Sequence, residues 1–206
     1  MKIFDVRDVP LATDAQLAVV DNPRHRHILK NFRRHGILEV SGLWPQILDP
    51  IMTVEHPLYK MFEGGRYHVF DGMDAVKGFY SAITDGEVNV FGPIEEHVAV
   101  SDHGIFTEAI FARVVRGDSP FLTPEDGVDA DGIYQITNHI AMAWPYEKGR
   151  LQGEHVWENN LSREVHEVGD ASYLISPEQA RERLAPLLAQ SPLDEIVEGL
   201  KLFAYD

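Results

Sequence analysis

One stretch of the sequence, residues 133–160, constrains the fold more than any other. It reads IYQITNHIAMAWPYEKGRLQGEHVWENN. Two runs rich in apolar and aromatic residues, 134–144 and 151–157, flank a polar turn that contains Gly149. A glycine in a polar turn between two such runs is typical of a β-hairpin. The sequence therefore predicts an antiparallel pair of strands in this region.

Polar side chains interrupt both predicted strands, at Asn138, His139, Glu154 and His155. Burying a polar group without a partner costs roughly 1–3 kcal/mol, so these groups must face water, pair with one another or line a cavity. Neighbours along a strand point to opposite faces. Only one member of each adjacent pair can therefore face a cavity directly, and we expect the histidines, His139 and His155, to do so.

Charge and composition exclude several classes of protein. The 206 residues include 18 basic and 33 acidic side chains, which gives a net charge of −15 with histidine neutral. Such a chain repels nucleic acid and anionic membranes, which attract clustered lysine and arginine. It has no cysteine, so disulfides and zinc–thiolate sites are excluded. The acidic N-terminal segment, MKIFDVRDVP, is unlike a signal peptide, and we expect a cytoplasmic protein without membrane partners.

The remaining sequence predicts an α+β fold in a single domain, residues 1–206. Asn22 caps a helix over residues 23–41, in which Pro23 takes the first helical position. Two tail helices begin at Ser176 and Ser191, each followed by proline. The other predicted elements are a short helix at 44–51, a short strand at 52–56, a helix at 73–83, strands at 88–100 and 104–115, and a long loop at 116–132. This order predicts a curved antiparallel sheet with helices on one face.

Three segments together resemble the nuclear-transport-factor-2-like superfamily, nearest its SnoaL-like branch of polyketide cyclases. They are His56-Pro57 with FDGMDAVKGFY at 70–80, EHVAVSDHGIFTEAIF at 96–111, and the hairpin at 144–159. Within the hairpin, GRL at 149–151 and GEHVW at 153–157 fit the family pattern, although Asn159 stands where aspartate is usual. The resemblance covers about residues 24–160. The 116–133 insertion and the helical extension at about 170–206 are additions to it.

The resemblance implies a cone, a cystatin-like α+β barrel in which a bent sheet wraps around the N-terminal helices and encloses one apolar cavity. Enzymes of this family include cyclases, ketosteroid isomerases, dehydratases, epoxide hydrolases and a formaldehyde-releasing lyase, and most need no cofactor. Family members commonly form homodimers through the outer face of the sheet. Many are binding or assembly modules, so the fold alone does not fix the function.

Histidine and carboxylate are the side chains that suit proton transfer in such a cavity. The expected catalytic residues are His56, Glu108, His139 and His155. The expected substrate-binding residues are Tyr59, Tyr67, Asn138, Trp144 and Trp157. We expect no metal and no cofactor, because the sequence has no HExxH helix, and Asp129-Ala130-Asp131-Gly132 lacks the remaining ligands of a calcium loop.

These residues favour a cofactor-independent lyase that acts on a small hydroxylated, aromatic substrate by elimination or by retro-aldol cleavage such as formaldehyde release. A polyketide cyclase or ketosteroid-type isomerase is the first alternative, and a non-catalytic ligand-binding or dimerisation module is the second. A lyase predicts several independent polar groups inside the cavity. A one-base isomerase predicts a single buried acid with a neutral donor, and a binding module predicts an apolar or collapsed cavity.

Overall fold

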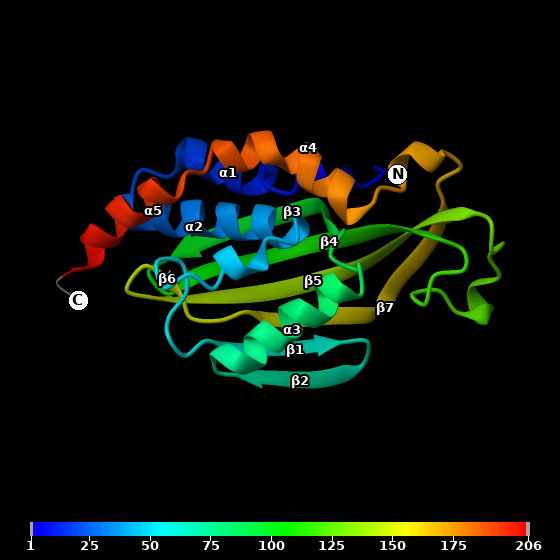
Figure 1. Ribbon diagram of the computed structural model, residues 1–206, viewed down its shortest axis with the longest axis horizontal. Coiled ribbons are helices and arrows are strands. Elements are labelled where there is room, and N and C mark those ends of the chain that lie inside the picture. Colours follow the sequence, from blue (N-terminus) through cyan, green and yellow to red (C-terminus); the bar gives the residue numbers. More distant parts are fainter. Residues whose placement is uncertain (1, 205–206) are drawn as a thin grey trace.

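A computed structural model describes residues 2–204, in which a curved, open sheet lies against a layer of helices (Figure 1). The order of the strands is β2-β1-β7-β5-β4-β3. Their bounds are β1 Leu58–Glu63, β2 Arg66–Asp71, β3 Gly92–Ser101, β4 Gly104–Arg116, β5 Ile133–Glu147 and β7 His155–Glu167. A short strand, β6 Arg150–Leu151, pairs with β5 beside this path. All neighbours in the order are antiparallel except β1 and β7, which run parallel.

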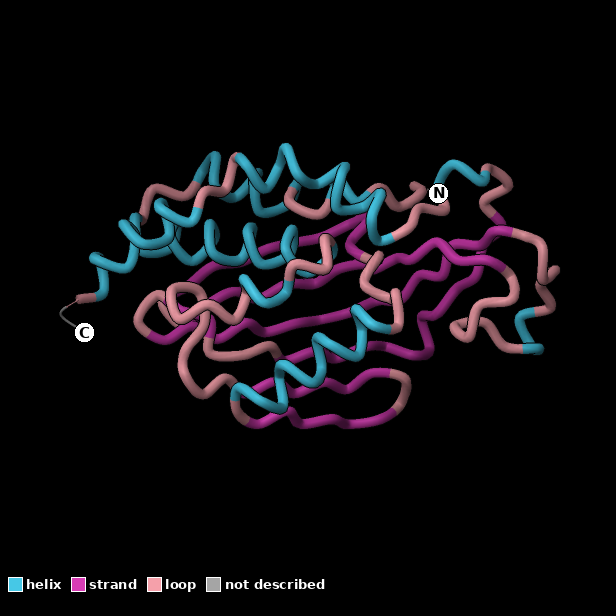
Figure 2. The backbone as a smooth tube through the Cα atoms, in the orientation of Figure 1, coloured by secondary structure: helices cyan, strands magenta, loops and turns pink. Residues whose placement is uncertain are grey.

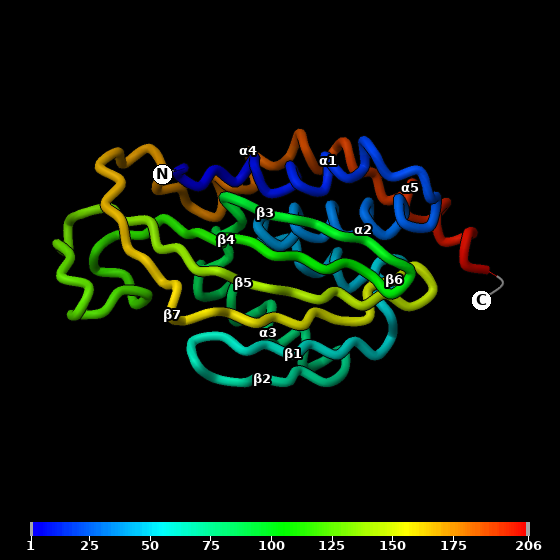
Figure 3. The backbone as a smooth tube through the Cα atoms, turned by 180° about the vertical axis from the view of Figure 1, so that it is seen from behind, coloured from blue at the N-terminus to red at the C-terminus, as the bar shows by residue number. Residues whose placement is uncertain are grey.

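The central helix, α2 Pro23–Val40, lies along the concave face of the sheet (Figure 2). The side chain of Asn22 accepts hydrogen bonds from the backbone N–H groups of Arg24 and His25, and Pro23 follows, as the sequence predicts. The other helices are α1 Leu11–Val19, α4 Pro177–Ala189 and α5 Leu193–Leu200, which pack beside α2, and α3 Met73–Asp85, which lies over the β1–β2 hairpin. The view from behind shows the convex face of the sheet uncovered by these helices (Figure 3).

The hydrophobic core fills the space between α2 and the sheet. Ile28, Leu29 and Phe32 of α2 pack in one cluster with Met142 of β5 and Val156 of β7. A second cluster lies on the other side of α2, where Ala180 and Leu184 of α4 meet Ile37. The tail helices therefore pack against the outside of α2 rather than over the concave face of the sheet.

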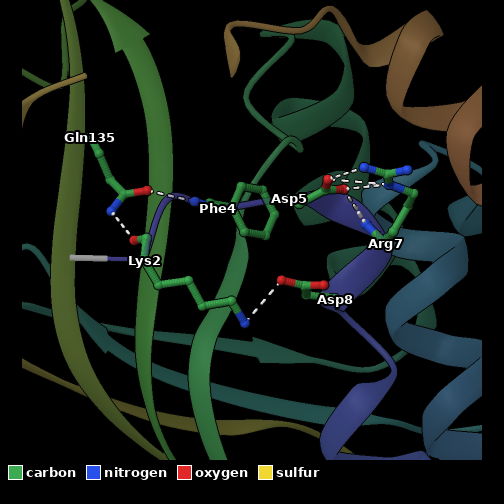
Figure 4. A network of polar contacts seen from close by, with 6 residues as sticks. All are labelled: Lys2, Phe4, Asp5, Arg7, Asp8 and Gln135. Carbon is green, nitrogen blue, oxygen red and sulfur yellow. Dashed lines mark hydrogen bonds and ion pairs between the residues drawn. The ribbon is translucent and has the colours of Figure 1, made fainter. Parts of the chain in front are cut away.

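The N-terminal segment is fastened to the sheet by Gln135 of β5 (Figure 4). The Gln135 side chain accepts a hydrogen bond from the backbone N–H of Phe4 at 2.7 Å and donates one to the carbonyl of Lys2 at 3.0 Å. One buried amide thus satisfies two backbone groups of a segment that has no strand partner of its own.

The expected fold class, α+β with a curved sheet around the N-terminal helices and extra C-terminal helices, is confirmed. The strand expected at 52–56 is wrong: that segment forms turns with one isolated bridge between Thr53 and Leu151, and β1 starts after Pro57 instead of ending before it. Only a 3-10 turn, Trp44–Gln46, occupies the expected helix at 44–51. Three further elements were not predicted from the sequence: α1, the β1–β2 hairpin and the continuation of β7 to Glu167.

Candidate active site

A cavity of about 240 Å³ lies between α2, α3 and the concave face of the sheet. A smaller space of about 60 Å³ beside α1 continues it, and both are lined by Glu39, Met142 and Glu154. Much of the lining is aromatic, from Phe79, Phe91, Phe111 and Phe121. A larger hollow of about 470 Å³ near Phe4 and Arg183 lies apart from these groups. The aromatic cavity with carboxyl groups inside it is the candidate active site.

Glu154 is placed in the cavity by the close approach of β1 to the start of β7. A Cβ added at Gly153 would lie 1.9 Å from the carbonyl oxygen of Leu58, so only glycine fits there. The backbone N–H groups of Leu58 and Lys60 donate to the carbonyls of Gln152 and Glu154 on either side. Glu154 is 6% exposed and one of its carboxyl oxygens, Oε2, has no hydrogen-bond partner. Burial, followed by the charge of Glu39, raises the pKa of Glu154 well above its usual range.

Two residues one turn apart on α2, His35 and Glu39, face Glu154 across the cavity. Both are buried, and His35 Nε2 lies 3.7 Å from a carboxyl oxygen of Glu39. Their orientation follows from helical spacing, because residues 35 and 39 continue the inward-facing row that begins with Ile28 and Phe32. Among residues 2–204, no lysine or arginine forms an ion pair with Glu39 or Glu154.

A chain of hydrogen bonds leads from His35 to two buried tyrosines. The Tyr80 hydroxyl lies 3.1 Å from His35 Nε2 and 3.1 Å from the Tyr59 hydroxyl. Burial is the main reason that the pKa values of Tyr59 and Tyr80 lie well above the usual range of tyrosine. These phenols therefore stay neutral and can pass protons or donate hydrogen bonds. Trp144 packs edge-on against His35, with ring centroids 5.1 Å apart, and holds the imidazole in place.

At the mouth of the cavity, Arg113 of β4 lies near Glu63 of β1 and Glu158 of β7. Its guanidinium lies 4.0 Å from the ring centre of Phe121 and 5.4 Å from that of Phe91. Burial lowers the pKa of Arg113, and the two glutamates oppose that shift. The Glu63 residue as a whole is exposed, but the atoms packed around its carboxyl group, followed by the charge of Glu158, raise its pKa to about 7.

The loop after β4 reaches the cavity through Phe121. Arg163 of β7 fixes this loop, because its guanidinium donates to both carboxyl oxygens of Asp126 and to the Phe121 carbonyl, at 2.7–3.0 Å. The hydrogen bonds from Arg163, followed by the one from the Thr123 backbone, lower the pKa of Asp126 to about 2. The loop is thus ordered at the mouth of the cavity, whereas α4 and α5 do not line it.

The only donor set in residues 2–204 with the spacing of a metal site is His35, Glu39 and Glu154, whose ligand atoms lie within 4.8 Å of one another. Three ligands around one zinc ion lie roughly 3–3.5 Å apart, given bonds of about 2.0–2.2 Å. The cluster would have to contract to hold an ion. The hydrogen bond between His35 Nε2 and the Tyr80 hydroxyl occupies one ring nitrogen, while His35 Nδ1 and Glu154 Oε2 have no hydrogen-bond partner.

The four expected catalytic residues do not meet in the cavity. Glu108, His139 and His155 lie on the outer face of the sheet, and Glu108 and His139 are exposed. His56 lies at the surface before β1 and pairs with Asp71 at 2.9 Å. Strand alternation is the physical reason: the face that carries Glu154, Val156 and Glu158 lines the cavity, which turns His155 outward.

The expected substrate-binding residues divide between the two faces. Asn138 lines the main cavity and Trp144 lines the smaller one, while Tyr59 is buried in the hydrogen-bond chain behind them. Tyr67 and Trp157 are 60% and 50% exposed and lie away from the cavity. Only Asn138, Trp144 and Tyr59 are therefore close to the carboxyl groups.

The sequence contained signals for the residues that were missed. Ile136, Ile140 and Met142 alternate with small or polar residues, and this alternation places Asn138 rather than His139 on the inner face. The inward row of α2 marks His35 and Glu39 in the same way. Glu63 and Arg113 carried no comparable signal, because their place at the mouth depends on the pairing of strands far apart in the sequence.

No protein-family model matches the sequence, and no curated protein matches it. The structure is similar to Bal32a from a soil-derived mobile gene cassette, with 15% identity, a TM-score of 0.46, and coverage of 67% of this chain and 93% of that one. It is also similar to an NTF2-like protein from Anabaena variabilis, with 10% identity, a TM-score of 0.47, and coverage of 69% and 94%. A third similar structure is a phenazine biosynthesis-related protein from Pseudomonas aeruginosa, with 13% identity, a TM-score of 0.39, and coverage of 76% of this chain and 83% of that one.

The family name expected from the sequence thus recurs among the similar solved structures, while the SnoaL-like branch does not. At these identities and scores, the activities of those proteins are not transferred to this chain. Within residues 2–204, no helix combines the length and the apolar character needed to span a membrane. The functional argument therefore depends on the cavity itself.

Proposed function

We propose that the protein is a lyase that transfers protons to and from a small hydroxylated aromatic substrate bound in the cavity. The observation that carries this proposal is Glu154, a buried carboxyl group with one unpartnered oxygen that faces Glu39. Burial, followed by the nearby charge of Glu39, raises the pKa of Glu154 well above its usual range and so favours its protonated form. Such a pair supplies an acid and a base in the same site.

The pair can complete an elimination without any co-reactant. The ionised carboxylate takes a proton from a substrate carbon, the electron pair forms the new double bond, and the C–O bond breaks. The protonated carboxyl gives its proton to the departing hydroxyl, so that water leaves and the pair again holds one proton. For C–C cleavage, the base takes a hydroxyl proton instead, a carbonyl is released, and the acid protonates the carbon left behind.

The surrounding residues have supporting roles in this proposal. His35, Tyr80 and Tyr59 provide a hydrogen-bonded path that can redistribute the proton. The phenylalanine lining suits an aromatic ring, and Asn138 offers an amide for a substrate hydroxyl. The 116–132 loop acts as a lid that carries Phe121 and is held by Arg163.

The range of polar groups in the cavity favours a lyase over the alternatives. A one-base isomerase needs a single buried acid and a neutral donor, whereas Glu39, Glu63, Glu154 and Arg113 all line this cavity. A pure binding module needs neither a proton-sharing pair nor a phenol chain. The isomerase nevertheless remains the second candidate, because Tyr59 and Tyr80 are neutral donors close to the carboxyl pair.

A screen of hydroxylated one- and two-ring aromatic compounds tests the proposal. Binding is detected by thermal stabilisation, and turnover by loss of water or release of formaldehyde. Glu154→Gln should reduce kcat by roughly 10²–10⁴-fold, the usual contribution of an acid–base group. Glu108→Gln, on the outer face, is the matched control and should leave kcat unchanged. Arg163→Met should raise KM more than it lowers kcat, because it frees the lid.

Two results would contradict the proposal. One is turnover that survives Glu154→Gln at the wild-type rate. The other is activity that disappears with a chelator and returns with a divalent ion, which would assign the His35–Glu39–Glu154 cluster to a metal.

A further inference from the structure

Arg113 differs from other arginines of the protein in what its guanidinium contacts. Arg33, Arg34 and Arg163 are each held by two or more hydrogen bonds to carboxylates, a hydroxyl, a side-chain amide or backbone carbonyls. Arg113 lines the cavity and, among residues 2–204, has no hydrogen bond and no ion pair within 4.0 Å. Its measured contacts are with the rings of Phe121 and Phe91.

Stacking of this kind leaves the donors of Arg113 free. An aromatic ring covers the face of a guanidinium, while the N–H groups point outward in the guanidinium plane. Arg113 is half-buried, and burial lowers its pKa. A partly desolvated cation without hydrogen bonds is destabilised, and a ligand that accepts two parallel hydrogen bonds offsets that cost.

We propose that the substrate of this cavity carries a carboxylate, which binds the N–H edge of Arg113 while the rest of the molecule extends toward Glu154. The proposal deepens the proposed function by naming the substrate class as an aromatic carboxylic acid. A single guanidinium with one free edge matches the two oxygens of a carboxylate. Asn138 lines the same cavity and supplies a further amide donor.

The acidic residues of the cavity limit the ligand to a single negative charge. The same space as Arg113 is lined by four glutamates, which are Glu39 of α2, Glu63 of β1, Glu154 just before β7 and Glu158 of β7. Glu158 accepts a hydrogen bond from the backbone N–H of Gly64 at 2.6 Å, which directs one of its carboxyl oxygens toward the β1–β2 turn. A phosphate dianion would meet more repulsion here than a carboxylate does, so a monoanion is the better match.

Glu63 makes carboxylate binding dependent on pH. Its pKa of about 7 means that it is roughly half protonated at neutral pH. A bound carboxylate adds negative charge nearby and favours the protonated form, which can then donate a hydrogen bond to the ligand. Binding therefore takes up a proton, and the affinity should fall as the pH rises from 6 to 8.

Matched pairs of ligands test the inference directly. Calorimetry or Trp144 fluorescence measures the binding of one- and two-ring hydroxylated aromatic carboxylates and of the corresponding neutral amides. The wild type should bind at least one carboxylate about 10–100-fold more tightly than its amide, which is the effect of a charged hydrogen-bonded pair worth roughly 1.5–3 kcal/mol. Arg113→Met should abolish this preference, and Arg113→Lys should keep only part of it, because lysine lacks the planar fork.

Arg116 provides the control on the same strand. It is exposed and pairs with Asp118 and Asp131, so Arg116→Met should preserve the carboxylate preference. Thermal melting confirms that each variant folds. The inference is overturned if no carboxylate of the panel binds, if the amides bind equally well, or if Arg113→Met keeps the preference.

A second variant separates this inference from the proposed function. Glu154→Gln should abolish turnover but retain the preference for carboxylate over amide. Turnover of neutral substrates that requires Glu154, with no carboxylate preference, would refute the role of Arg113 alone. If the preference for carboxylate over amide is kept but Glu154→Gln leaves turnover unaffected, the acid–base function alone is refuted.

Discussion

The two faces of the sheet carry similar side chains in different environments. On the outer face, Glu108 and His139 lie exposed in neighbouring strands. On the inner side, Glu154 and His35 are buried and meet few partners. Water can satisfy the polar atoms of the exposed residues, whereas the buried ones depend on partners inside the protein or on a bound ligand. Burial, rather than residue type, therefore separates the candidate functional groups from the ordinary surface.

The largest expected difference between the faces is in the effect on kcat of replacing one histidine on each, His35 on the inner side and His139 on the outer face. His35→Gln breaks the path from Tyr80 to Glu39, and we expect kcat to fall by roughly 10²–10⁴-fold. His139→Gln changes an exposed side chain and should leave kcat and KM unchanged. Steady-state kinetics of both variants on a substrate found by the screen provides the measurement. Equal effects of the two substitutions would remove the distinction.

A smaller effect is expected on the pH dependence of stability, from Glu96 of β3. Burial raises its pKa from 4.5 to about 7, so the folded protein binds more protons than the unfolded chain between these values. The free energy of unfolding should therefore fall as the pH rises from about 4.5 to 7, by at most about 3 kcal/mol from this group.

Glu96→Gln should remove that decline. The stability gained by the variant over the wild type should therefore be larger at pH 8 than at pH 4.5. Denaturant unfolding at the two pH values measures the change. Glu95, the next residue on β3, is exposed and serves as the control. A pH dependence that is identical in the Glu96→Gln variant and the wild type would show that Glu96 is not desolvated in solution.

The smallest effect on activity is expected from the outer face itself. Phe62, Phe106 and Trp157 are 38%, 50% and 50% exposed, and we propose that this face joins two copies of the chain in a homodimer. Trp157→Ser should shift the mass measured by light scattering toward the monomer, with kcat little changed. A wild-type protein that is monomeric at micromolar concentration would refute the dimer.

The sequence predicted the layers of the fold better than the site. Local signals, such as the Asn22 cap and the proline at position 23, were enough to locate α2. Buried Val156 marks the inward face of β7, but the aromatic side chain of Trp157 favoured the opposite face in the prediction from sequence. The mouth of the cavity was beyond prediction, because Glu63, Arg113 and Glu158 come together only through the pairing of β1, β7, β5 and β4.

The parallel pairing of β1 with β7 has a consequence for how the cavity exchanges its contents with solvent. Three residue pairs, from Lys60–His155 to Phe62–Trp157, join β1 to β7, and one more hydrogen bond joins Leu58 to Gln152. By contrast, thirteen residue pairs join β4 to β5. The hairpin is therefore the part of the wall that detaches at least cost, without global unfolding. Its amide protons should exchange with solvent before those of β4 and β5, and this local opening gives a ligand a way past Met61 and Glu63.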